Sequence, residues 1–196
     1  MPIADFFIVR ILNSIRVETD YDEDDIDMMR YSLQAILWEI EKTVYMVIIF
    51  TLLGHHWPFF AAMFAVMTIR PNAGGFHSST VWGCFGWTML GFSLAIFVLP
   101  HIPLNDLTVL LVALFSLVTT FIATPVRSLQ KERIADKSKD GQKKFKATAV
   151  TVIWFVVLFL NQTNFLAPAV LWIIFLQNLQ LLIEYVKRKV MPVASS

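Results

Sequence analysis

Hydrophobic positions fall in long runs along most of this chain, and polar residues gather in the short stretches between them. Such runs predict helices surrounded by lipid, since about 20 apolar residues span the hydrocarbon core of a bilayer. The predicted helices cover residues 23–54, 57–69, 78–99, 107–123, 147–160 and 165–183. The second and fifth are shorter than a perpendicular span, so they must extend into polar flanks, thin the bilayer or stop part-way.

The N-terminal 1–20 has a different pattern. Within it, residues 3–16 repeat apolar side chains at helical spacing. This predicts an amphipathic helix lying in the headgroup plane, and a helix packed on the inner end of the bundle fits equally well. The acidic group between Glu18 and Asp27 is interpreted as a helix cap with solvated carboxylates, because it lacks a metal-ligand pattern.

Composition supports a membrane protein with a single embedded domain over 1–196. The chain is 57% hydrophobic and 16% charged, with a mean hydropathy of +0.63, unlike ordinary soluble domains. The net charge of +1 indicates no partner, since in membrane proteins the position of Lys and Arg matters more than their sum. We expect membrane lipid as a partner and no nucleic acid.

Basic residues predict the orientation. Arg70 follows the second run, eight Lys and Arg residues lie within 127–146, and three more lie within 187–189. No Lys or Arg lies in the opposite connections, near 54–57, 100–106 and 161–164. This positive-inside pattern predicts an all-α integral membrane protein, a six-helix transmembrane bundle with both termini cytoplasmic and a basic cytoplasmic loop over 124–146. Four crossings with short re-entrant pieces would give the same charge distribution.

The candidate chemistry is concentrated between the second and third runs. Cys84, the chain's only cysteine, lies seven residues after His77, which follows the pair Gly74 and Gly75. A thiol and an imidazole are the nucleophile and general base of many acyl-transfer sites. In the predicted topology they lie at the cytoplasmic end of the bundle, where the glycines would let a substrate backbone approach. Cys84 is expected about two turns into its helix.

Helix geometry constrains this pair. If 77–84 were wholly helical, the two side chains would share a face but stand ~10 Å apart along the axis, beyond hydrogen-bond reach. We therefore expect His77 to leave the helical path, or the pair to close when substrate binds. Without such a role, Cys84 is a small packing residue and His77 a polar anchor. The other histidines are on the opposite side of the membrane and are interpreted as interfacial anchors: His55, His56 and His101.

This stretch resembles the accessory gene regulator B (AgrB) family, membrane endopeptidases that process the peptide precursors of Gram-positive quorum sensing. The matching residues are Arg70, Gly74, Gly75, His77 and Cys84, followed downstream by the basic loop. The resemblance implies that His77 takes the proton of Cys84, and that the glycines serve as backbone positions. Arg70 would hold an acidic tail or steady the site, and interfacial anchoring is an equal alternative. Candidates for orienting the base and for stabilising an oxyanion stay open: Asn72, Ser78, Ser79 and backbone N–H groups.

The resemblance also implies a reaction and its partner. The substrate is a precursor peptide with an amphipathic leader, a central Cys or Ser, and an acidic C-terminal tail. Cleavage forms a thioester on Cys84, and cyclisation then gives a thiolactone or lactone autoinducing peptide. No cofactor or metal is implied, and the location is the cell membrane of a Gram-positive bacterium. The basic loop contacts anionic headgroups, docks the acidic tail or does both, through Lys131, Arg133, Lys143 and Lys144.

Two other classes of function compete with this one. A small transporter or exporter is suggested by polar residues near the sixth run: Asn161, Gln162, Asn164, Gln177, Asn178 and Gln180. Against it, the apolar centres of the third, fourth and fifth runs contain no ionisable residue of the kind that marks a transport path. A non-enzymatic membrane scaffold is favoured only if Cys84 is inert. Trp- and Phe-rich outer faces are compatible with a homodimer.

Overall fold

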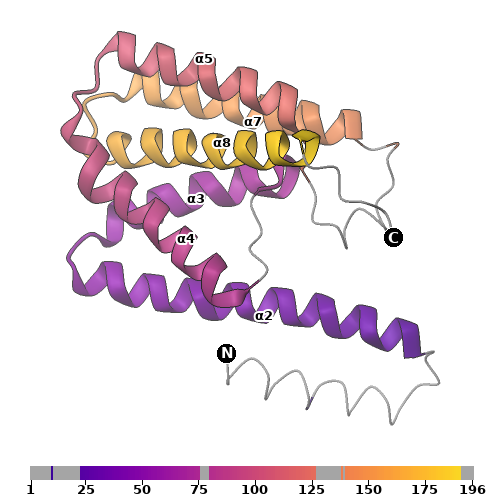
Figure 1. Ribbon diagram of the computed structural model, residues 1–196. Coiled ribbons are helices and arrows are strands. Elements are labelled where there is room, and N and C mark those ends of the chain that lie inside the picture. Colours follow the sequence, from indigo (N-terminus) through magenta and orange to yellow (C-terminus); the bar gives the residue numbers. More distant parts are fainter. Residues whose placement is uncertain (1–9, 11–22, 76–79, 127–137, 139, 191–196) are drawn as a thin grey trace.

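The computed structural model describes residues 10, 23–75, 80–126, 138 and 140–190. Within them the chain is all-helical and has no β-strand, which confirms the predicted class (Figure 1). The α-helices are α2 (Glu23–Leu52), α3 (His56–Ala73), α4 (Val81–Ser93), α5 (Asp106–Ala123), α7 (Asp140–Leu160) and α8 (Ala167–Val190). A π-helical turn, Leu94–Val98, and a 3-10 turn, Leu99–His101, continue α4.

Two helix boundaries differ from the predicted ones. α7 begins at Asp140, so part of the predicted loop over 124–146 is helical and Lys143 and Lys144 lie on its first turns. The apolar run marks only the part suited to lipid, whereas Asp140 favours an earlier helix start. α8 similarly continues to Val190 through its basic end. Apart from Arg10, the predicted N-terminal helix lies outside the described residues.

Three stretches among the described residues are long and apolar enough to cross a membrane: Trp82–His101, Asp106–Ala123 and Ala167–Val190. On α5, which forms the second of them, Leu110, Leu114 and Phe121 are exposed on the outside of the bundle. Exposed large apolar side chains suit a surface in contact with lipid. The membrane class is thus supported by the structure, while six crossings with cytoplasmic termini stay a prediction.

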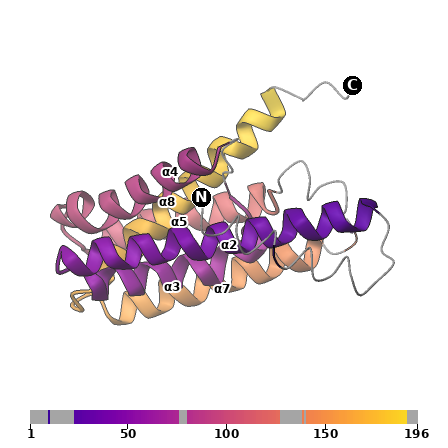
Figure 2. The same ribbon diagram turned by 90° about the horizontal axis from the view of Figure 1, so that it is seen from below.

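α8 is the central helix. It packs against α3 and α5 and also contacts α4 and α7, while α3 packs directly against α7 (Figure 1). Leu171, Ile174 and Leu181 of α8 are almost fully buried. Figure 2 shows its C-terminal turns leaving the rest of the bundle. Because lipid tails are as apolar as these side chains, close packing and interhelical hydrogen bonds must hold such a bundle together.

Interhelical contacts of both kinds are present. Phe50 of α2 stacks on Phe59 of α3, with ring centroids 4.8 Å apart. The hydroxyl of Thr120 on α5 donates to Asn178 Oδ1 on α8 at 2.7 Å, and both residues are buried. Asn178 Nδ2 in turn donates to the Ile174 carbonyl at 2.9 Å. This polar residue of α8 therefore joins two helices.

Candidate active site

Cys84 lies at the end of the first turn of α4. The helix begins at Val81 after the N-cap Thr80, whose hydroxyl accepts from the Gly83 N–H at 3.1 Å. The Cys84 N–H donates to the Thr80 carbonyl at 3.0 Å. Our expectation of two helical turns before Cys84 was therefore wrong, because the threonine cap starts the helix later. A local signal for this start was present in the sequence, as Thr is a preferred N-cap residue.

The thiol of Cys84 is free and half-buried. The Thr88 hydroxyl, one turn further along α4, donates to the Cys84 carbonyl at 2.8 Å. Thr88 and Gly91 follow Cys84 at helical spacing, so the three residues share one face of α4. Both Thr88 and Gly91 line a pocket between α3, α4 and α8. Cys84 therefore lies on the helix face that is turned toward this pocket, nearer the start of α4.

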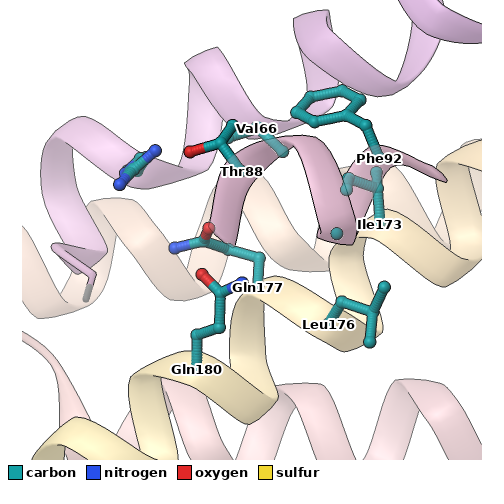
Figure 3. Close-up of a pocket in the computed structure, with 9 residues that line it drawn as sticks. Val66, Thr88, Phe92, Ile173, Leu176, Gln177 and Gln180 are labelled. Carbon is teal, nitrogen blue, oxygen red and sulfur yellow. The ribbon is translucent and has the colours of Figure 1, made fainter. Parts of the chain in front are cut away.

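The pocket has a polar and an apolar side. Figure 3 shows the amides of Gln177 and Gln180 next to each other on one side, with Phe92, Ile173 and Leu176 on the other. Among the described residues, its lining is Val66 and Arg70 of α3, Thr88, Gly91 and Phe92 of α4, and Ile173, Leu176, Gln177 and Gln180 of α8. At its α4 wall a Cβ on Gly91 would lie 3.7 Å from Gln180 Nε2, which is an ordinary van der Waals contact.

Gly74 ends α3 in a conformation that favours glycine, with φ +84°. Its N–H donates to the Arg70 carbonyl at 2.9 Å, and its own carbonyl accepts from Gln177 Nε2 at 3.1 Å. The Val126 N–H donates to the Ala73 carbonyl at 3.0 Å, which pairs Gly74 with Val126 as an isolated parallel bridge. The chain that approaches Gly74 is therefore the protein's own segment after α5.

Gly75 is buried against two side chains. A Cβ on Gly75 would lie 3.2 Å from Gln177 Nε2 and 3.3 Å from Arg70 Nε. The structure thus brings together three motif residues, Arg70, Gly74 and Gly75, and adds Gln177. Sequence reasoning did not place Gln177 in the site. The signal that could have singled it out is a polar amide within an apolar membrane helix, because such an amide needs a hydrogen-bond partner there.

Other predicted site residues lie elsewhere. His77, Lys131 and Arg133 fall outside the described residues. Lys143 and Lys144 lie on α7, which does not line the pocket, and the Lys144 ammonium is 4.0 Å from the centre of the Phe121 ring. Across the described part of the chain, no group of three or more His, Cys, Asp or Glu residues could hold a metal ion.

Comparison with known proteins settles the family. The sequence profile named "Accessory gene regulator B" matches residues 8–181. The chain belongs to the AgrB family. Among the curated relatives, AgrB-like protein 1 of Clostridium perfringens (strain 13 / Type A) is 20% identical to this chain over 183 residues. These residues cover 91% of this chain and 96% of that protein. An AgrB-like protein of Clostridium beijerinckii is 28% identical over 163 residues, 81% of this chain and 78% of its own length. No solved structure matches the chain significantly.

Membership of the AgrB family connects the chain with peptide processing in the accessory gene regulator system. The match includes every residue of the motif from Arg70 to Cys84, together with all six described α-helices in whole or in part. The family assignment agrees with a membrane protein, because three described stretches are long and apolar enough to cross a bilayer.

Proposed function

We propose that this AgrB protein is a membrane cysteine endopeptidase that removes the C-terminal tail of a small propeptide and promotes its cyclisation. One observation carries the proposal: in a member of this family, the only cysteine is free and half-buried, and it lies in the first turn of α4 at helical spacing from the pocket residues Thr88 and Gly91. A nucleophile at the end of a helix's first turn is close to N–H groups that lack intrahelical acceptors. Those of Val81 and Trp82 are our candidates for stabilising an oxyanion.

The proposed reaction has two acyl transfers. His77 accepts the proton of the Cys84 thiol, and the thiolate attacks the carbonyl carbon of the peptide bond before the tail. The C–N bond breaks, the tail leaves with that proton on its new amine, and a thioester remains on Cys84. A thiol or hydroxyl of the propeptide then gives its proton to His77 and attacks the thioester. The ring closes as a thiolactone or lactone, and Cys84 regains a proton from His77.

The half-buried position of Cys84 suits this sequence of steps, because water must be kept from the thioester until the ring closes. Transfer of an acyl group from one thiol to another is nearly isoenergetic, so the thioester preserves the energy needed for cyclisation. Arg70 and the basic residues of the chain would attract the acidic tail. In this proposal the site is on the cytoplasmic side of a Gram-positive cell membrane.

The transporter alternative receives less support. Two of the polar residues that suggested a path, Gln177 and Asn178, are buried and donate to backbone carbonyls. A third, Gln162, donates to Asp106 Oδ1 at 2.9 Å and connects the α7–α8 turn to the start of α5. Polar side chains used in this way stabilise helix contacts, which is their ordinary role within membrane bundles.

The test is co-expression with a propeptide that has an amphipathic leader, a central Cys and an acidic tail. We expect Cys84→Ala and His77→Ala each to abolish release of the tail at unchanged membrane abundance, while Cys84→Ser keeps at most a trace. Gly86→Ala is the control on the same helix, because a Cβ there meets nothing within 4 Å. Tail release by Cys84→Ala would disprove the catalytic assignment.

A further inference from the structure

Gln177 is distant in sequence from the motif but contacts it directly. Its side chain is buried, with the residue 6% exposed, and its Nε2 donates to the Gly74 carbonyl at 3.1 Å. A buried amide needs hydrogen-bond partners, and here the partner is the backbone of a glycine with φ +84°. An amide of the central helix α8 therefore holds the turn at which α3 ends.

Among the described residues, two backbone hydrogen bonds and one from the side chain of Gln177 hold this turn. Gly74 N–H to Arg70 carbonyl and Val126 N–H to Ala73 carbonyl are both backbone bonds that survive most substitutions. The bond from Gln177 depends on a side chain, so a substitution at residue 177 can remove it. The chain then runs from Gly75 to Cys84, so the turn sets where the segment that contains His77 begins.

A substitution at Gly75 would also disturb the Gln177 amide. A methyl group on Gly75 would lie 3.2 Å from Gln177 Nε2, which is closer than the ~3.5–4.0 Å of an ordinary contact. The amide would have to move away, and its bond to Gly74 would weaken. Substitutions at residues 75 and 177 should therefore damage one shared contact.

We propose that Gln177 is a positioning residue of the endopeptidase site, which acts by holding the Gly74–Gly75 turn against α8. The inference rests on the proposed function and extends it to a residue outside the motif. Because Gln177 acts through backbone geometry, its loss should slow the chemical step more than it weakens propeptide binding. A misplacement of about 1 Å in a catalytic group can cost about 100-fold in rate.

The experiment uses the full-length chain in membrane vesicles with the propeptide described above. Rates are expressed per amount of protein in the membrane fraction, and the Tm of each variant in detergent shows that it is folded. We expect Gln177→Leu, which keeps the size but removes the donor, to lower kcat about 10- to 100-fold with KM changed less than about threefold. Gln177→Met also lacks the donor and should lose as much. Gln162→Leu removes a matched glutamine at the opposite end of the bundle and should retain full kcat.

A double variant tests the shared contact. If Gly75→Ala and Gln177→Leu act on one hydrogen bond, the double variant should be no slower than the slower single variant. Multiplied losses would mean independent roles and would overturn the inference. So would normal kcat in both Gln177 variants, or a raised KM with unchanged kcat, which would make Gln177 a substrate contact. In each of these cases the endopeptidase proposal stands if Cys84→Ala is inactive, and it fails only if Cys84→Ala still cleaves.

Discussion

The carbonyl oxygen of Val126 lies 1.8 Å from the position that a Cβ on Gly74 would occupy. The two residues come from the ends of different helices, α3 and α5, and are paired by a backbone bridge. Val126 is followed directly by the basic segment, and Gly74 lies between Arg70 and His77. We expected the motif around Gly74 to serve catalysis and the basic segment after Val126 to dock the tail. The backbone bridge between Gly74 and Val126 therefore places the motif next to the start of the basic segment.

Gly74→Ala should impair cleavage much more than Gly54→Ala. Both glycines have positive φ, +84° and +74°, which strains an alanine by about 1–3 kcal/mol, and the ψ of −158° at Gly74 lies in a region that is essentially restricted to glycine. Only at Gly74 does the new methyl group also meet backbone, because nothing lies within 4 Å of a Cβ at Gly54. We expect at least about a tenfold loss of tail release for Gly74→Ala and near-normal release for Gly54→Ala, at equal amounts of membrane protein. Equal effects would mean that the Gly74–Val126 approach is unimportant.

The hydrogen bond between Thr120 and Asn178 should contribute to stability rather than to catalysis. Thr120→Val keeps the shape but leaves the buried Asn178 Oδ1 without this donor. We expect a loss of about 1 kcal/mol, seen as a lower Tm in detergent with kcat unchanged. Ser116→Ala is the matched control on α5, because the buried Ser116 hydroxyl has no partner in the described part of the chain. A Tm as low for Ser116→Ala would argue against a specific role for the bond.

Charge reversal on α7 should weaken substrate capture in a salt-dependent way. Lys143→Glu is expected to raise KM for a propeptide with an acidic tail more at about 0.02 M salt than at about 0.5 M, since salt screens exposed charges. Lys187→Glu reverses an exposed charge near the end of α8 and should change KM less. Lys144 is a poorer probe because its ammonium also contacts the Phe121 ring. A KM shift that does not depend on salt would leave only anchoring to lipid.

The predicted orientation can be measured by cysteine labelling. Replacing Cys84 with Ser removes the only native thiol, and single cysteines can then be placed at Thr163, in the α7–α8 connection, or at Lys187. With the termini cytoplasmic, a membrane-impermeant maleimide added to intact cells should label Thr163→Cys and not Lys187→Cys. The reverse pattern would place the proposed site on the outer face.

The helices were predictable because their signal is local. An apolar run long enough for a bilayer favours a helix whatever surrounds it, and α2, α3, α5 and α8 begin close to their predicted starts. The start of α7 was missed because its basic first turns do not look like a membrane segment, although nothing in them prevents a helix. The depth of Cys84 was missed because Thr80 was not taken as an N-cap.

By itself, the sequence determined the helical membrane class, the AgrB motif and the candidate nucleophile, since each depends on residues that are close together in the chain. Only the tertiary structure decided that Gly74 meets Val126 and Gln177. Those contacts form when α3, α5 and α8 pack, and hydrophobic periodicity reports that a helix has an apolar surface without reporting which neighbour covers it. Gln177 therefore looked like one of several polar residues near the sixth run, until packing placed its amide against the glycine turn.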